Sequence, residues 1–398
     1  MRCFRNRGRK FERLMLAVAV IVLTQSASSL PSQQPANRRS APEVIAYIFP
    51  RDRVIQPGEI AARKLTRINY AFANIQDGRM VAVSPADTPN LATLVALRQQ
   101  NPSLQVLISV GGWLWSGNFS DAALTPQSRS RFIESVVSFV KDHDLDGLDV
   151  DWEYPGQTGA GNRFRPEDKR NYTLLLAEIR KRFDAEQRRL RRPLLLSIAA
   201  GASDQFLDHT EMRQVVGSVD TVNLMAYDYY EPGSDPIAAN HAPLYLDPAD
   251  PKRISADSSV RDFESAGVPA HKIVLGVPFY GHIWGNVAPT NHGLFQTGSA
   301  VPNAFARYQD IVSTMLDHGF TRYWDASASA PYLYNAQTEQ FVSYDDPESL
   351  ALKCAYVQHM HLGGVMFWEY SADASGALLD TIDHAFSVGS RSSAEVGR

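Results

Sequence analysis

One stretch decides the fold of this chain. Residues 145–155 read Leu-Asp-Gly-Leu-Asp-Val-Asp-Trp-Glu-Tyr-Pro, so acidic and apolar side chains alternate along it. A period of two is typical of a β-strand, whose successive side chains point to opposite faces. Asp149, Asp151 and Glu153 therefore share one face of a predicted strand, and apolar side chains share the other. An acidic inner face and an apolar outer face indicate a strand that lines a barrel.

Three carboxyl groups on one face of a strand must interact. Like charges at this spacing repel, so at least one carboxyl is expected to stay protonated near neutral pH. A protonated acid beside an ionised carboxylate is what hydrolysis of a glycosidic bond requires. The alternatives are a solvated edge strand and a calcium loop. An edge strand would not need the apolar outer face, and a calcium loop would include glycine, asparagine and a turn among its ligands.

Length and charge limit the class of protein. The chain has 398 residues, of which 44% are hydrophobic and 21% charged, which is enough for one large domain with an insertion or for two ordinary domains. The formal net charge is −4. Six basic residues against one acidic residue among the first 13 give +5 there, which leaves −9 for the remainder. An acidic body without a basic patch argues against a nucleic acid as partner.

The first 28 residues read as a secretory signal peptide. The basic start is followed by ten apolar residues (14–23) and then by small residues. The apolar core is too short to span a bilayer comfortably, and an uncleaved anchor is the alternative. We therefore expect a secreted protein (extracellular or periplasmic), without stable membrane association after cleavage, and a monomer. Cleavage leaves Cys354 as the one cysteine, so no internal disulfide is expected.

Beyond a linker at 29–41, short apolar runs alternate with amphipathic stretches. Eight runs predict buried strands, and most are followed by a helical pattern, which indicates an α/β fold of the (β/α)8 TIM barrel type. The barrel is expected over 42–281 and 347–388, with a small α+β insertion domain at 282–346 between strand 7 and helix 7, and a tail at 389–398. The predicted strands are Val44–Phe49, Arg67–Ala73, Gln105–Gly111, Gly147–Glu153, Leu194–Ala200, Thr221–Tyr227, Ile273–Tyr280 and Gly363–Trp368.

Helical patterns are expected between and after these strands. Within the insertion, residues 307–318 have a helical pattern, and residues 332–334 and 340–344 read as short strands. Active sites of such barrels form at the carboxyl ends of the strands, where Glu153 would end strand four. The predicted barrel helices are Ser128–His143, Pro166–Glu186, Ser258–Ala266 and Pro347–His361.

The pattern Asp-Gly-x-Asp-x-Asp-x-Glu at 146–153 resembles glycoside hydrolase family eighteen, the chitinases and their relatives. Four further motifs resemble that family in the same order, and together they cover residues 42–385. His282 stands where many relatives have arginine. The motifs are Ser109–Trp113, Met225–Asp228, Lys272–Gly281 and Gly364–Glu369. The resemblance is to bacterial chitinases with an α+β insertion domain.

Glu153 is expected to be the general acid and base, because burial and the like charge of Asp151 can raise its pKa. Asp151 lies about 6.6 Å further back along the strand. Its position alone would allow a nucleophile, since retaining carboxyl pairs stand about 5–5.5 Å apart. The resemblance implies instead a retaining, substrate-assisted (oxazolinium) mechanism, in which Asp151 holds the acetamido group of the sugar. It implies that Asp149 shares a proton with Asp151 and that Tyr227 orients the acetamido carbonyl.

The remaining candidates are substrate-binding residues. The resemblance implies that Trp368 forms the floor of the cleaved subsite and that Asp228 contacts the distorted sugar. For Met225, Trp113 and Tyr280, ordinary packing is the alternative to lining the groove. The full set is Asp228, Met225, Trp368, Tyr47, Phe72, Trp113 and Tyr280.

No cofactor and no metal are expected, because the histidines show no ligand spacing in the sequence. The expected function is that of a secreted chitinase that hydrolyses β-1,4-N-acetylglucosamine linkages in chitin or chitooligosaccharides. Two alternatives remain. One is an endo-β-N-acetylglucosaminidase acting on N-glycans, and the other is a non-catalytic chitin-binding lectin on the same barrel.

Overall fold

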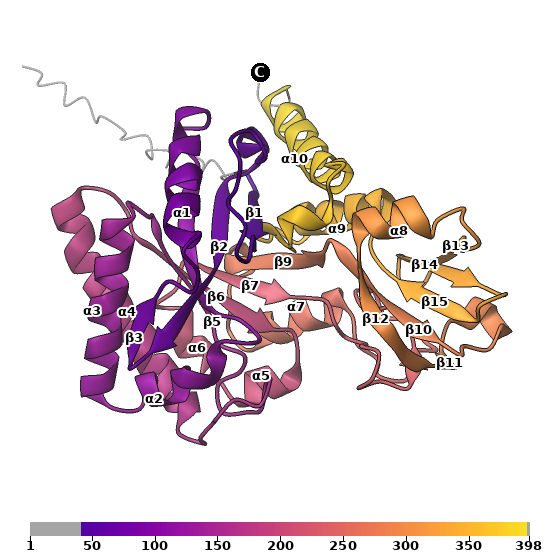
Figure 1. Ribbon diagram of the computed structural model, residues 1–398, viewed down its shortest axis with the longest axis horizontal. Helices are drawn as coiled ribbons and strands as arrows, with labels where there is room; N and C mark the ends of the chain where they lie inside the picture. The colour runs from indigo at the N-terminus through magenta and orange to yellow at the C-terminus, as the bar shows by residue number, and fades with distance from the viewer. Residues whose placement is uncertain (1–40, 396–398) are drawn as a thin grey trace, which may run out of the picture. The chain divides into compact units, whose positions relative to one another are not determined.

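Eight parallel strands close into a barrel in the computed structural model, which describes residues 41–395 (Figure 1). They follow the order β1-β16-β9-β7-β6-β5-β4-β2, and pairing of β1 with β2 closes the ring. The expected (β/α)8 barrel is therefore confirmed. The strands are β1 (Glu43–Ile48), β2 (Arg67–Gln76), β4 (Gln105–Gly111), β5 (Gly147–Asp151), β6 (Leu195–Gly201), β7 (Thr221–Met225), β9 (Ile273–Pro278) and β16 (Gly364–Trp368).

Helices surround these strands, and several begin at a threonine, serine or aspartate that caps the helix amino terminus. Thr125, Ser255 and Asp346 each accept a hydrogen bond from the backbone N–H three residues ahead, and a proline occupies the first turn of two of these helices. The longer helices are α1 (Asp87–Ala96), α3 (Pro126–Asp142), α4 (Asp168–Leu190), α7 (Ala256–Ser265), α9 (Pro347–His359) and α10 (Ala377–Glu395). Shorter ones are α2 (Phe119–Ala123), α5 (Asp204–Asp208) and α6 (Met212–Val215).

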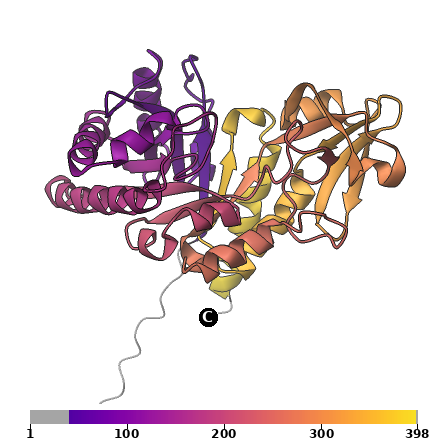
Figure 2. The same cartoon turned by 90° about the horizontal axis from the view of Figure 1, so that it is seen from below.

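A second, antiparallel sheet follows β9 and has the order β12-β10-β15-β14-β13. In Figures 1 and 2 it lies to one side of the barrel strands. Its first strand starts two residues after β9 ends, so this sheet is rooted at the carboxyl end of a barrel strand. The elements are β10 (Tyr280–Gly285), β12 (Ser299–Arg307), α8 (Tyr308–Thr314), β13 (Thr321–Asp325), β14 (Ala330–Asn335) and β15 (Gln340–Ser343).

Parity along β5 places its side chains as the alternation predicts. Leu148 and Val150 are fully buried in the layer between strands and helices. Trp152 follows them on the same side and stacks on Phe119 of α2, with ring centroids 5.1 Å apart and planes 12° apart. The acidic residues consequently point into the barrel. The strand ends at Asp151, so Glu153 lies two residues beyond it and not at its last position.

Two further observations bear on the sequence-based expectations. Cys354 is fully buried in α9 and behaves as a small apolar side chain. Among residues 41–395, no helix combines the length and the apolar character that crossing a membrane requires. The expected signal peptide (1–28) and nearly all of the expected linker lie outside the described residues.

Candidate active site

The three carboxyl groups of the alternating stretch line up from the barrel interior toward its mouth. Asp149 is fully buried, while Asp151 and Glu153 are 4% and 9% exposed. The backbone beyond β5 is fixed on both sides. The N–H of Glu153 donates to Ser116 Oγ (2.9 Å), and its carbonyl accepts from Asn162 Nδ2 (2.8 Å). Glu153 therefore leaves the strand in a defined direction although it no longer belongs to the sheet.

Two glycines, the last residue of strand β4 and the residue that follows it, allow this close packing. Gly111 has φ +104°, and a Cβ there would lie 2.2 Å from the carbonyl oxygen of Asp151. Gly112 has φ +76°, and a Cβ there would lie 2.6 Å from the ring of Phe72. The N–H of Gly112 donates to the same carbonyl oxygen of Asp151 at 2.7 Å. Glycine is required at both positions for steric and conformational reasons.

Asp149 is held by four neutral donors from other barrel strands. Burial raises its pKa, and these hydrogen bonds work in the opposite direction by stabilising the carboxylate. None of the donors is Asp151, and the expected sharing of a proton between Asp149 and Asp151 stays a prediction. The donors are Tyr47 Oη (2.8 Å), Ser109 Oγ (2.8 Å), Ser197 Oγ (2.6 Å) and Asn223 Nδ2 (3.1 Å).

The pKa values of Asp151 and Glu153 are both raised. Burial, followed by the like charges of Glu153 and Asp149, raises the pKa of Asp151 well above its usual value. Burial also raises the pKa of Glu153 to about 7, with a further contribution from the charge of Asp228. Two carboxyl groups that interact this closely titrate as a pair, so their protons do not belong to one residue alone. An acid and an anion can therefore stand side by side here.

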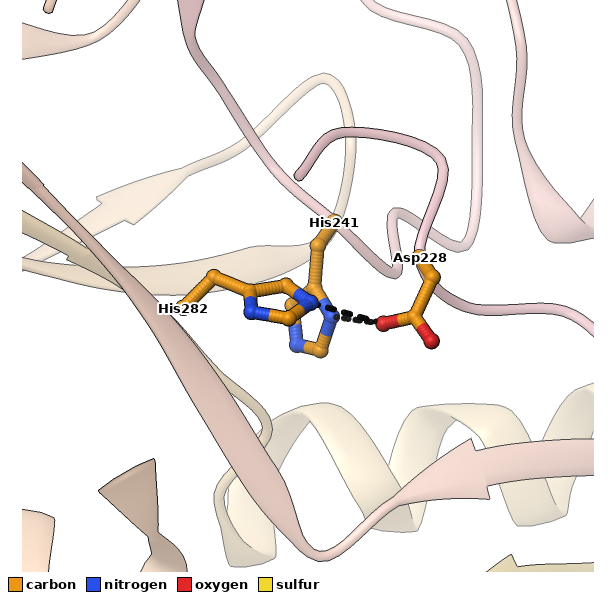
Figure 3. Close-up of side chains that lie close together, drawn as sticks. All are labelled: Asp228, His241 and His282. Atoms are coloured by element: carbon orange, nitrogen blue, oxygen red, sulfur yellow. Dashed lines mark hydrogen bonds and ion pairs between the residues drawn. The ribbon is translucent and has the colours of Figure 1, made fainter. Parts of the chain in front are cut away.

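Asp228 lies just beyond strand β7 and receives three contacts on one oxygen, of which Figure 3 shows the two from imidazoles. Its Oδ1 accepts from Tyr280 Oη at 2.7 Å and lies 2.8 Å from His282 Nε2 and 3.4 Å from His241 Nδ1. Burial raises the pKa of Asp228, but the hydrogen bonds of the two histidines outweigh it and hold the pKa below its usual value. The other oxygen points away from both imidazoles (Figure 3), and the Asp228 side chain as a whole is 35% exposed.

Aromatic rings pack around Trp368 at the end of β16. Its ring lies 5.6 Å from Phe72, with planes 25° apart, and 5.9 Å from Tyr47. Phe49 and Trp115 complete the cluster. Trp368 is itself half-buried, as are Met225 and Tyr227. This partly exposed apolar surface beside the carboxyl row can accept the C–H face of a sugar ring.

The structure gives several predicted residues a more specific place. Tyr47 is 2% exposed, its hydroxyl donates to Asp149 Oδ2, and its ring contacts that of Trp368. Tyr280 is buried and stacks on Phe305 of β12 at 4.6 Å, which favours the packing alternative. Trp113 is 51% exposed, which excludes packing in the core, and its place in the groove stays a prediction.

Some residues of the site were not predicted. Phe49 and Trp115 belong to the aromatic cluster, and Phe49 directly follows strand β1, where barrel sites form. His241 and His282 were expected to be scattered, because 41 positions separate them in the sequence. The fold brings their rings to 4.9 Å. Only the position of His282 directly after the Tyr-Gly of strand seven was a signal, since arginine is usual there.

Comparison with known proteins agrees with this geometry. Chitinase A1 of Niallia circulans is 42% identical over 322 residues, which are 76% of this chain and 46% of that protein, so the chain spans less than half of that relative. Chitinase B of Serratia marcescens is 31% identical over 82% of this chain and 77% of its own length. The structure of a glycoside hydrolase family 18 N-acetylglucosaminidase from Paenibacillus barengoltzii superposes with a TM-score of 0.79 at 40% identity, over 86% of this chain and 99% of that one. The family model described as glycosyl hydrolases family 18 matches residues 43–373, and the chain belongs to that family.

Proposed function

We propose that this protein is a chitinase that hydrolyses β-1,4-linked N-acetylglucosamine chains. The observation that carries the proposal is the row of three buried carboxyl groups, Asp149, Asp151 and Glu153, that ends at the mouth of the barrel, where burial raises the pKa of Glu153 to about 7. An acid with such a pKa is protonated often enough at neutral pH to donate and becomes a base once it has done so. A lectin on the same barrel would not need this acid.

The first step breaks the bond between the anomeric carbon and the glycosidic oxygen. Glu153 donates its proton to that oxygen, and the leaving sugar departs as an alcohol. The acetamido oxygen of the substrate attacks the anomeric carbon from the opposite side and forms a cyclic oxazolinium ion. Before this step the proton of the pair lies on Glu153, so Asp151 is anionic. It stabilises the positive charge that develops on the oxazolinium ion next to it.

The second step opens the oxazolinium ion. Glu153, now ionised, takes a proton from water, and the oxygen of that water bonds to the anomeric carbon. Each step inverts the configuration at this carbon, so the product retains the configuration of the substrate. Tyr227 is half-buried beside the row, and its hydroxyl is assigned to the acetamido carbonyl. Asp149 and its four hydrogen-bond donors fix the middle of strand β5 to other barrel strands.

Sugar binding is assigned to the surfaces around this row. Trp368, Met225 and the free oxygen of Asp228 surround the cleaved sugar, and the exposed ring of Trp113 extends the aromatic surface. Residues of β10 contact Asp228 directly, and we assign one wall of the substrate groove to the second sheet. A groove made deep by this insertion would suit a linear polymer better than a branched N-glycan, which favours chitin over an endo-β-N-acetylglucosaminidase substrate.

The mechanism is tested by the configuration of the first product. Proton NMR of chitotetraose hydrolysis, recorded before mutarotation, is expected to show the β-anomer, and a thiazoline analogue of the cyclised sugar is expected to inhibit competitively. The α-anomer as first product would overturn retention. A β-anomer without thiazoline inhibition would indicate a covalent intermediate on Asp151. Cleavage of a high-mannose glycopeptide and not of chitotetraose would favour the endoglycosidase.

Secretion is part of the proposal and rests on the leader at residues 1–28. Expression of the full chain with its own leader is expected to yield a protein outside the cytoplasm whose amino terminus lies close to residue 29. Recovery of the intact leader on a membrane-bound protein would indicate an uncleaved anchor. Size-exclusion chromatography of the mature chain is expected to give a monomer.

A further inference from the structure

Two buried imidazoles and one carboxylate converge at the edge of the candidate active site. All ten histidines of the chain lie in its described part, and His241 and His282 are the two of them that are buried. They come from different segments, since His282 lies on β10 and His241 lies in the connection between β8 (Ile237–Ala238) and α7. Both direct a ring nitrogen at Oδ1 of Asp228 (Figure 3).

The spacing of these three atoms is close to that of a metal-binding set. His282 Nε2 and His241 Nδ1 lie 2.8 and 3.4 Å from Asp228 Oδ1, and all three atoms lie within 4.8 Å of one another. Ligands at about 2.0–2.1 Å from a tetrahedral zinc ion are about 3.3 Å apart. The two distances to Asp228 Oδ1 are already within about 0.5 Å of that value. A modest rotation of the imidazoles would shorten the third distance, between the two ring nitrogens, to the same value.

The charge around the three atoms favours a cation. Asp228 is ionised, and after burial its charge is the next contribution that raises the pKa of Glu231 nearby. Glu153 experiences the same like charge. Among the described residues no arginine or lysine forms an ion pair with Asp228. Its direct partners are two imidazoles and the hydroxyl of Tyr280, none of which carries a permanent positive charge.

The tautomers of the imidazoles are free to adapt. Either ring nitrogen of a neutral imidazole can carry the proton, and a metal ion needs the lone pair of the nitrogen that faces it. The second nitrogen of His241, Nε2, is buried without a hydrogen-bond partner, so no neighbour fixes its protonation state. The proton of this ring can therefore move to Nε2 when a metal ion occupies the space at Nδ1.

We propose that Asp228, His241 and His282 bind one divalent transition-metal ion of the zinc type, and that the bound ion inhibits the enzyme. Two imidazoles and a carboxylate are ligands that Zn²⁺, Cu²⁺ and Ni²⁺ prefer, whereas Mg²⁺ and Ca²⁺ prefer oxygen alone. The fourth position would hold water. The ion displaces the hydroxyl of Tyr280 from Oδ1 and places positive charge where Asp228 is assigned to the sugar. The inhibitory part rests on the proposed function, and the binding part does not.

Binding is measured without turnover on the mature chain from residue 29. Isothermal titration with Zn²⁺ and the visible absorption of added Co²⁺ are expected to give one site per chain, while Mg²⁺ gives none. His282→Arg removes a ligand but leaves Asp228 a cationic partner, so the fold is kept, as checked by its unfolding temperature. The variant is expected to weaken Zn²⁺ binding by at least about 100-fold, and His241→Gln to do the same. His359→Gln is the matched control, because His359 is exposed.

Unchanged Zn²⁺ affinity in a folded His282→Arg variant, or equal binding of Mg²⁺, would overturn the site. If the wild-type chain binds no Zn²⁺ at millimolar concentration, the cluster is only a hydrogen-bonded support of Asp228 and the proposal fails. For inhibition, Zn²⁺ is expected to reduce chitotetraose hydrolysis by the wild type at the concentration that fills the site, and not by His282→Arg at that concentration. Equal inhibition of both would refute the inhibitory role while leaving the hydrolase assignment intact.

Discussion

Replacing Glu153 by glutamine is expected to stabilise the folded protein at alkaline pH and not at acidic pH. In the folded chain burial raises the pKa of this carboxyl to about 7, against an ordinary value of 4.5. The folded state therefore binds a proton more tightly than the unfolded state. The stability that this one carboxyl contributes is fully present below pH 4.5. It falls as the pH rises toward 7, and above pH 7 it changes no further. Glutamine cannot ionise, so the variant avoids this loss.

The magnitude follows from the difference in pKa. One pKa unit corresponds to about 1.36 kcal/mol, so keeping Glu153 ionised in its buried position costs about 3 kcal/mol above pH 7. The change also removes the like charge that acts on Asp151 after burial, which works in the same direction. Side-chain shape is preserved, so no cavity forms. We expect a gain in the free energy of unfolding of about 2–3 kcal/mol at pH 8.5 and close to zero at pH 4.5.

The assay is urea unfolding, followed by tryptophan fluorescence at both pH values. Glu134→Gln is the control, because Glu134 is exposed on α3 and its replacement should change stability by less than about 0.5 kcal/mol. A Glu153→Gln variant that is no more stable than the wild type at pH 8.5 would refute the burial argument. A gain of the same size at both pH values would show that the effect does not come from ionisation.

Three further predictions concern other residues. Hydrolysis of chitotetraose is expected to fall about tenfold per pH unit above pH 7, because Glu153 loses the proton that it donates; a rate that stays flat to pH 9 would contradict this assignment. Lys353→Met is expected to lower the free energy of unfolding by about 3–5 kcal/mol, because it leaves Asp345 unpaired where both side chains are 1% exposed; thermal unfolding of the variant would test this, and an unchanged midpoint would argue against it. Trp113→Ala is expected to raise KM for long chitooligosaccharides about 3–10-fold at unchanged stability, because a half-exposed ring contributes about 0.5–1.5 kcal/mol of aromatic contact; equal KM values would remove Trp113 from the groove.

The barrel could be predicted because its signals are local. Period two along residues 145–153 determines which side chains of β5 face inward, and Trp152 lies outward as parity requires. The ends were less certain. Strand β2 continues to Gln76 because it pairs with β3 (Arg79–Val81) in a hairpin, and no apolar pattern in the sequence predicted this hairpin. Strand β12 carries mostly exposed side chains and β13 mostly half-buried ones, so neither has the apolar pattern of a buried strand.

The site was predictable where one strand carries it and not where several strands meet. The row on β5 could be found from its spacing alone. The hydroxyl of Tyr47 reaches Asp149 across 102 positions of sequence, and this contact exists only because β1 closes the ring. The pair of His241 and His282 likewise depends on the connection after β7 returning to the first strand of the insertion. Local pattern carries no information on such contacts.

Turnover of chitotetraose by the wild type and by Glu153→Gln tests the central claim most directly. A sugar leaving group needs a proton, so loss of the acid is expected to reduce kcat by about 10²–10⁴-fold. Binding of chitotetraose by calorimetry should remain within about threefold, since glutamine keeps the shape of the side chain, and Glu134→Gln should match the wild type. A Glu153→Gln variant that keeps a tenth or more of the wild-type kcat would contradict the assignment of Glu153 as the acid of a family 18 hydrolase.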